Sequence, residues 1–240
     1  SLAADVEVIE LMLESLVLAG LTEVRLEIGH IGLFHALADA ADMDDRLREE
    51  VFIALQQKDL PSLKAATAGL PAELQTAFLA LPNCYGGKDV LALARTALPA
   101  IPAVTQALDL LEALDVALAV RGIRTRYDLA ELRSSYYHTG LVFAVYATGF
   151  ANAVARGGRY DSVGEKFGRS RPATGFSLDL RELSHLPYPE RRLGILAPGL
   201  EDAALLVKVR ELRKQGEIVA VDLGMPREES GCYRQLVKVG

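Results

Sequence analysis

The spacing of apolar residues changes from a helical period to a period of two near Gly122. Before this glycine, apolar residues recur every three or four positions over residues 104–118, which predicts a long amphipathic helix. After it, residues 123–129, 136–147 and 150–156 alternate as strands do. The connections between these segments are too short for helical crossovers, so we expect them to pair as an antiparallel meander. This sheet has to form the centre of the fold.

The chain before this sheet is predicted to add one strand and several helices. Apolar residues at helical spacing between positions 6 and 16 predict a first helix, and residues 23–28 alternate as a strand with one buried face. Five prolines lie between residues 59 and 103, so only short helices fit, and we expect a helical insertion at about 40–100. An antiparallel sheet flanked by helices predicts the α+β class.

A second, smaller domain is predicted at the C-terminal end. Residues 184–190, Ser-His-Leu-Pro-Tyr-Pro-Glu, combine two prolines with an absence of periodicity, which is typical of a linker. A strand, a helix and a second strand are predicted between residues 193 and 221. The expected organisation is therefore a core over residues 1–185 and a small α/β domain over residues 186–240.

Charge and composition exclude several classes of protein. The 240 residues include 26 Lys and Arg against 32 Asp and Glu, a net charge of -6, which argues against a main role in gripping nucleic acid. We find neither an apolar run of the roughly 18 residues that a membrane span needs nor a basic signal-peptide start. Two distant cysteines, Cys84 and Cys232, fit a reducing compartment. We therefore expect a cytoplasmic protein without nucleic-acid or membrane partners.

Three kinds of chemical site find no support in the sequence. The turn Ala197-Pro198-Gly199 precedes a helix, but the G-x-G-x-x-G pattern is absent, and Glu201 and Asp202 would repel a pyrophosphate. His30 and His35 are five positions apart, which does not direct two imidazoles at one metal ion. No G-x-S-x-G elbow occurs. We predict no cofactor, no metal and no catalytic residue.

A fourth constellation points to a small ligand. Arginine, tyrosine and histidine side chains on adjacent strands, with a diglycine that lets a ligand approach the backbone, suit a molecule with a carboxylate and a ring. An alternative stays open, in which Arg159 and Asp161 form a structural ion pair and the tyrosines are core residues. The candidate ligand-binding residues are Arg133, Tyr136, Tyr137, His138, Gly157, Gly158 and Arg159.

These segments resemble a known family. Arg133 to Phe143, Ala155 to Asp161 and Arg171 to Phe176 are similar to the histidine-recognition and third-motif regions of histidyl-tRNA synthetases. They are more closely similar to the non-catalytic paralogue of these enzymes, the regulatory subunit of ATP phosphoribosyltransferase. The stretches at residues 4–9 and 24–34 match that paralogue too. The resemblance covers residues 3 to 185 and implies a class II aminoacyl-tRNA synthetase-like fold.

Departures from the synthetase pattern favour the paralogue. Tyr136 occupies the position of an aspartate, His138 that of a second tyrosine, and Ala144 that of the acid of a V-F-E motif. Glu182 stands where the resemblance places an ATP-binding arginine, and Arg181 is one residue early. A carboxylate there would repel a triphosphate. The first two class II motifs are expected upstream of residue 1 and are not in this chain.

The resemblance implies a regulatory role in histidine biosynthesis. The family's partner, the catalytic subunit of ATP phosphoribosyltransferase, performs the chemistry in a hetero-octamer, and the regulatory chain supports activity and feedback by the effector histidine. A homodimer is implied for the full-length protein. The alternatives are a histidyl-tRNA synthetase fragment that activates histidine with ATP and a free-standing amino-acid-binding module. From Ser184 onward nine basic and eight acidic residues nearly balance, which argues against an anticodon reader.

Overall fold

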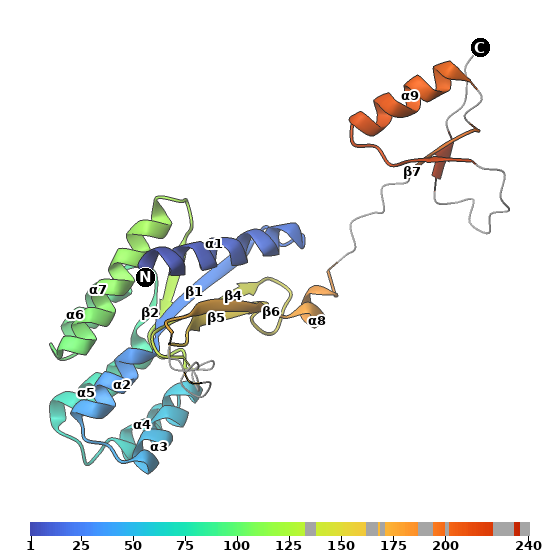
Figure 1. Ribbon diagram of the computed structural model, residues 1–240. Coiled ribbons are helices and arrows are strands. Elements are labelled where there is room, and N and C mark those ends of the chain that lie inside the picture. Colours follow the sequence, from blue (N-terminus) through green and yellow to red (C-terminus); the bar gives the residue numbers. More distant parts are fainter. Residues whose placement is uncertain are drawn as a thin grey trace. The chain divides into compact units, whose positions relative to one another are not determined.

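The computed structural model describes residues 1–132, 138–161, 168, 171–186, 194–199, 202–222 and 233–235. The chain divides into two compact units, Ser1–Leu186 and Pro187–Gly240 (Figure 1). Arg133, Tyr136 and Tyr137, three of the predicted ligand-binding residues, lie outside the described residues. No helix in the described ranges is long and apolar enough to cross a membrane.

The larger unit contains a six-stranded sheet in the order β2-β3-β1-β4-β5-β6. The pairs are antiparallel except for β1 and β3, which run parallel, so the sheet is mixed. The strands are β1 (Val24–His30), β2 (Tyr85–Gly86), β3 (Thr125–Asp128), β4 (Leu141–Ala147), β5 (Ala155–Arg159) and β6 (Thr174–Leu178).

The predicted meander is correct only in part. β4, β5 and β6 pair in sequence, but β1 lies between β3 and β4, so the segments predicted at residues 123–129 and 136–147 are not neighbours. The strand observed in the second segment begins at Leu141. β1 and β3 are joined through a series of helices, which is the kind of crossover that a parallel pair requires.

Helices precede, interrupt and follow these strands. Between residues 45 and 97 the chain forms short helices and the two-residue strand β2, in the region where an insertion is predicted. Asp44 caps one of them by accepting a hydrogen bond from the Leu47 amide at 2.8 Å, and Lys58 ends it at a φ of 53°. The helices are α1 (Leu2–Leu18), α2 (Ile31–Ala40), α3 (Asp45–Gln57), α4 (Leu60–Ala66), α5 (Ala72–Ala80), the 3-10 helix η1 (Leu81–Asn83), α6 (Asp89–Ala97), α7 (Pro102–Ala119) and α8 (Leu180–Leu183).

The sheet has one apolar face and one charged face. On β1 the alternate residues Leu26 and Ile28 are buried and lie opposite Val145 and Phe143 of β4. α1 and α7 pack on this side, where their apolar residues join the same core, and Figure 1 shows α1 running beside the strands. The alternate residues of the same strands, including Glu27, project to the opposite side. We call this side the charged face.

A buried ion pair ties α1 to β5. Asp5 is completely buried, and Arg159 donates to it from Nε at 3.0 and 3.1 Å and from Nη2 at 2.7 Å. These hydrogen bonds raise the pKa of the Arg159 guanidinium above its ordinary value. The alternation of β5 places Arg159 on the side of Gly157, the apolar face, so the ion pair lies at the edge of the core.

His30 lies beside this ion pair at the junction of β1 and α2. Its Nδ1 is buried without a hydrogen-bond partner among the described residues. Burial, and then the positive charge of Arg159, lower the pKa of His30 to about 4. Neutral His30 is therefore the form that the folded state accommodates.

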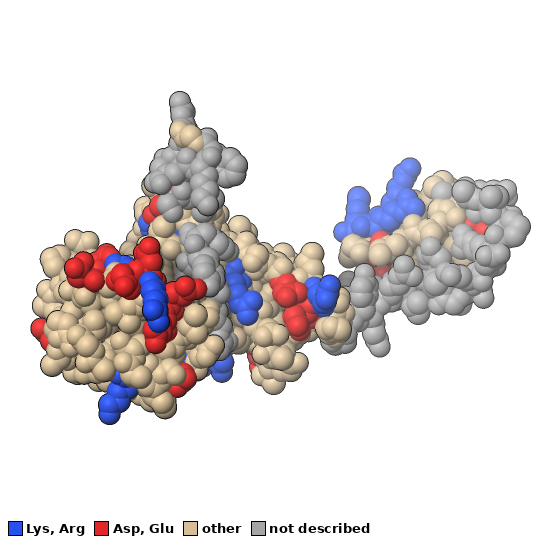
Figure 2. All heavy atoms as spheres, turned by 90° about the horizontal axis from the view of Figure 1, so that it is seen from below, with Lys and Arg blue, Asp and Glu red and all other residues tan. Residues whose placement is uncertain are grey.

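The smaller unit is a three-stranded parallel sheet with one helix. Its strands are ordered β8-β7-β9, so β7 is central. The core is formed by apolar residues of β7, α9 and β8, and basic side chains gather on this unit in Figure 2. The sequence predicts β7, α9 and β8 but not the third strand. The elements are β7 (Gly194–Ala197), α9 (Ala203–Lys214), β8 (Val219–Val221) and β9 (Tyr233–Gln235).

Removing the buried carboxylate should destabilise the larger unit. We expect Asp5→Ala to lower the free energy of unfolding by about 2–4 kcal/mol, because it leaves a partly buried guanidinium unpaired. Glu10→Ala is the matched control on the same helix: the Glu10–Arg121 pair, 36% and 43% exposed, should contribute less than about 1 kcal/mol. Urea denaturation measures both, and equal losses would contradict a special role for Asp5.

The shifted histidine should make stability depend on pH. A pKa near 4 in the folded state and about 6.5 in the unfolded state means that the unfolded chain binds the proton first, so stability falls as the pH drops between these values. From about pH 7 to 4.5 the native protein should lose about 2–3 kcal/mol more than His30→Gln. Denaturation curves at both pH values measure the difference. Parallel losses in the two proteins would show that His30 is not the group responsible.

Candidate functional site

Five side chains form one row across the charged face. Glu27 of β1 lies opposite Arg126 of β3 on one side and Ala144 of β4 on the other. Ala144 lies opposite Arg156 of β5, and Arg156 lies opposite Ser177 of β6. Cross-strand partners project to the same face, so an acid and two arginines gather around a small alanine.

Glu27 is the buried anion of this row. Its side chain is 7% exposed, and one oxygen, Oε1, lies 2.9 Å from Arg25 Nε. The hydroxyl of Tyr85 donates to the same oxygen at 3.1 Å. The Tyr85 ring in turn contacts two cations, Lys58 Nζ at 4.9 Å and the guanidinium carbon of Arg126 at 5.1 Å from its centre. Tyr85 therefore contacts both the carboxylate of Glu27 and the positive charges of Lys58 and Arg126.

Arg126 and Lys58 differ in their hydrogen bonds. Lys58 donates to the buried Asp128 at 2.6 Å. Arg126 Nε is buried and has no hydrogen-bond partner among the described residues. Arg25 and Arg126 carry two positive charges around the single negative charge of Glu27. This excess of positive charge favours an anionic group on a bound molecule.

Glycines in the next row of the charged face leave room for two aromatic rings. A Cβ on Gly158 would lie 2.7 Å from His138 Cδ2 and 2.5 Å from the Leu141 carbonyl oxygen. A Cβ on Gly175 would lie 2.6 Å from the Tyr160 hydroxyl. The His138 and Tyr160 rings meet edge to face, with centres 6.5 Å apart. Two rings therefore occupy the space that the missing side chains leave.

The predicted ligand-binding residues divide between the two faces. His138, which is 5% exposed, packs over Gly158 on the charged face. Gly157 lies opposite Phe143 on the apolar face, where a Cβ would collide with the Phe143 ring, and Arg159 is paired there with Asp5. The alternative pairing of Arg159 with Asp161 is replaced by this longer-range pair. The structure therefore brings His138 and Gly158 together and turns Gly157 and Arg159 away from them.

Sequence reasoning missed two residues of the charged face. The sequence shows Glu27 only as part of an alternating strand, and Arg156 only as part of the segment Ala155 to Asp161. The alternation does indicate that Glu27 opposes the buried side of its strand. It does not indicate that Ala144 and Arg156 follow in the same row, because strand order and register join residues far apart in the chain.

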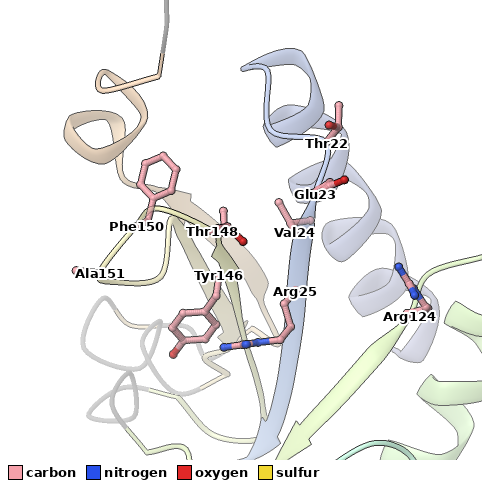
Figure 3. A pocket seen from close by; sticks show the side chains of 10 residues that line it. Thr22, Glu23, Val24, Arg25, Arg124, Tyr146, Thr148, Phe150 and Ala151 are labelled. Atoms are coloured by element: carbon pink, nitrogen blue, oxygen red, sulfur yellow. The ribbon is translucent and has the colours of Figure 1, made fainter.

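An open hollow of about 730 Å³ adjoins one end of the charged face (Figure 3). Arg25 and Tyr146, which pair across β1 and β4, line it and point toward each other, with the guanidinium carbon 5.4 Å from the ring centre. Glu23 and Arg124 also line it, so both signs of charge are present. Among the described residues no group of three His, Cys, Asp or Glu side chains could hold a metal ion.

Two family models match the chain in succession. The model described as histidyl-tRNA synthetase matches residues 1–183. The model described as ATP phosphoribosyltransferase subunit HisZ C-terminal domain matches residues 191–240.

Individual relatives agree with these matches. The ATP phosphoribosyltransferase regulatory subunit of Cupriavidus taiwanensis is 49% identical over 241 residues, which cover 99% of this chain and 62% of that protein. A crystal structure from Bacillus halodurans, described as an ATP phosphoribosyltransferase regulatory subunit/histidyl-tRNA synthetase, has a TM-score of 0.74 and 26% identity over 98% of this chain and 64% of its own. The HisG:HisZ complex of Thermotoga maritima, at 21% identity, matches 74% of this chain and 61% of its own with a TM-score of 0.55, which shows a shared fold.

The α+β architecture is thus that of class II histidyl-tRNA synthetase-like proteins, and the chain spans 62% of the length of its Cupriavidus relative. A match of this identity over nearly the whole chain shows that the chain belongs to the family of ATP phosphoribosyltransferase regulatory subunits.

Proposed function

We propose that this chain is part of the regulatory subunit of a short-form ATP phosphoribosyltransferase, which acts at the first step of histidine biosynthesis. The observation that carries the proposal is the 49% identity to a protein of that name over 99% of the chain. The HisZ C-terminal match over residues 191–240 supports the same choice over a synthetase. The catalytic subunit performs the transfer, and this chain supports its activity and its inhibition by histidine.

A residue in α8, the short helix that follows β6, supports the proposed absence of catalysis. Glu182, at the position where the resemblance places an ATP-binding arginine, lies in the short helix α8. Its amide, like that of Arg181, donates to Asp179 at 3.1 Å, which fixes the first turn of this helix. A carboxylate at this position disfavours a bound triphosphate. This position supports the proposal that the chain contributes no catalytic residue.

Histidine is the proposed effector, and the charged face is its proposed binding surface. His138 and Gly158 lie on this face, where the His138 ring packs against the Gly158 backbone. Arg133, Tyr136 and Tyr137 complete the proposed site. Gly157 and Arg159 belong to it indirectly, since Arg159 holds β5 against α1 through Asp5.

The remaining assignments follow from membership of a larger assembly. The proposed partner is the catalytic subunit, in a hetero-octamer that contains a homodimer of the full-length regulatory protein, located in the cytoplasm. The proposed domains are a synthetase-like core over residues 1–185 and a small α/β domain over 186–240. Neither domain is proposed to bind nucleic acid.

Co-purification with the catalytic subunit tests the proposal. We expect the full-length protein, expressed together with the short catalytic subunit, to elute with it as one complex in size exclusion. The complex should form phosphoribosyl-ATP faster than the catalytic subunit alone, and added histidine should slow it.

An assay of ATP–pyrophosphate exchange distinguishes the proposed regulatory subunit from a histidyl-tRNA synthetase. The pure full-length protein should show no histidine-dependent exchange between ATP and pyrophosphate, since the charge at Glu182 opposes ATP binding. Exchange by the pure protein would support a synthetase instead. A protein that binds histidine but neither joins nor accelerates the catalytic subunit would be a free-standing binding module.

A further inference from the structure

We propose that Glu27 and Arg156 bind the two charged ends of a free α-amino acid, the carboxylate of Glu27 holding its ammonium group and the guanidinium of Arg156 its carboxylate. This inference rests on the proposed histidine-binding function and names the residues that recognise the amino-acid backbone. Neither residue is among the ligand-binding residues that the sequence predicts.

The arrangement follows from the register. Glu27, Ala144 and Arg156 lie on three successive strands, in one row and on one face. Neighbouring strands are about 4.8 Å apart, so the Cα atoms of Glu27 and Arg156 are separated by about 10 Å. The methyl group of Ala144 between them is too short to reach either charge. The oppositely charged ends of a zwitterion match the two signs of this row.

Arg156 is the cation of the pair because no described residue satisfies its charge. The described residues make no hydrogen bond, ion pair or ring contact with its guanidinium, whereas Arg159, three positions along β5, is held by Asp5 at 2.7 Å. Its side chain is half-buried, so part of its hydration is already lost. A guanidinium in such a place gains more from a forked contact with a carboxylate than an exposed one does.

Glu27 is the anion of the pair because it is the buried acid of this row. The hydroxyl of Tyr85 donates to Oε1, and the shortest contact with Arg25 is made by the same oxygen. A buried carboxylate oxygen favours a charged donor. The Arg25 and Tyr85 contacts also hold the carboxylate in place, so little side-chain freedom is lost when an ammonium group binds.

The rest of the ligand is proposed to lie along the strands, against the rings of His138 and Tyr160, rather than across them. One row further, Gly158 and Gly175 have no side chains, and the rings of His138 and Tyr160 lie over them. A planar imidazole side chain beside these rings would complete contacts that the charged ends begin. Two adjacent rows of the charged face thus separate recognition of the amino-acid backbone from recognition of its side chain.

Three ligands that differ by one charge test this assignment in the full-length protein by calorimetry. Histidine has both charges, histidinol lacks the carboxylate, and imidazolepropionate lacks the ammonium group. We expect Arg156→Ala to weaken histidine about ten- to hundredfold and to leave histidinol within about twofold. Glu27→Gln should weaken histidine and histidinol to a similar degree and leave imidazolepropionate unchanged. Arg46→Ala, which removes an exposed arginine of α3, is the matched control and should bind all three as the native protein does.

The outcomes distinguish this inference from the function on which it rests. A native protein that binds no histidine would overturn the proposed effector. Native binding with unaltered affinities in both variants would overturn the charge pair and leave the effector standing. Equal weakening of all three ligands would also contradict the pair, because a disturbed fold does not discriminate between charges. Should Glu27→Gln fail to fold, the comparison of histidine with histidinol in Arg156→Ala still decides.

Discussion

The pairing of β1 with β4 is the constraint on which the rest of the larger unit depends. Seven consecutive residue pairs, from Val24–Ala147 to His30–Leu141, fix the register between two segments more than a hundred residues apart. Side chains alternate between faces, so this register decides which groups meet. A slip of one residue would turn Glu27 toward α1 and α7 and place Ile28 among the arginines. The burial of Leu26 and Ile28 excludes that slip and thereby sets the composition of the charged face.

The ion pair between Asp5 and Arg159 also keeps the two faces of the sheet distinct. It lies on the apolar face, opposite the charged face. Two charges at the edge of an apolar core are costly to dehydrate, and the three hydrogen bonds between them offset that cost. Because Arg159 is committed to the apolar face, the alternation of β5 leaves Arg156 on the opposite one. Arg159 is paired with Asp5, whereas Arg156, three positions away, has no charged partner among the described residues, and this difference cannot be read from their proximity in the sequence.

Local sequence patterns predict which helices and strands form better than they predict which strands pair. The alternation at residues 23–28 and the helical spacing at 104–118 correspond to β1 and α7, because burial of one side produces a regular period in the chain. The position of β1 between β3 and β4 could not be predicted, since it depends on packing of helices that lie between these strands in the sequence. The pairing of Arg159 with Asp5 rather than Asp161 was missed for the same reason. The meeting of Glu27 with Ala144 and Arg156 could not be predicted either, because it depends on strand order and register.

The cross-strand neighbours of Ala144 explain how the site can keep a carboxylate although this position has lost one. The resemblance to synthetases places an acid at this position, and its absence suggests that the pocket has lost an acceptor for a cationic ligand. The structure shows Glu27 as the direct partner of Ala144 on the adjacent strand, about 4.8 Å away. With Arg156 opposite on the other side, a carboxylate remains in the row although the motif lacks one. Because an acceptor can be supplied from a neighbouring strand, loss of a motif residue does not by itself remove the chemistry of the site.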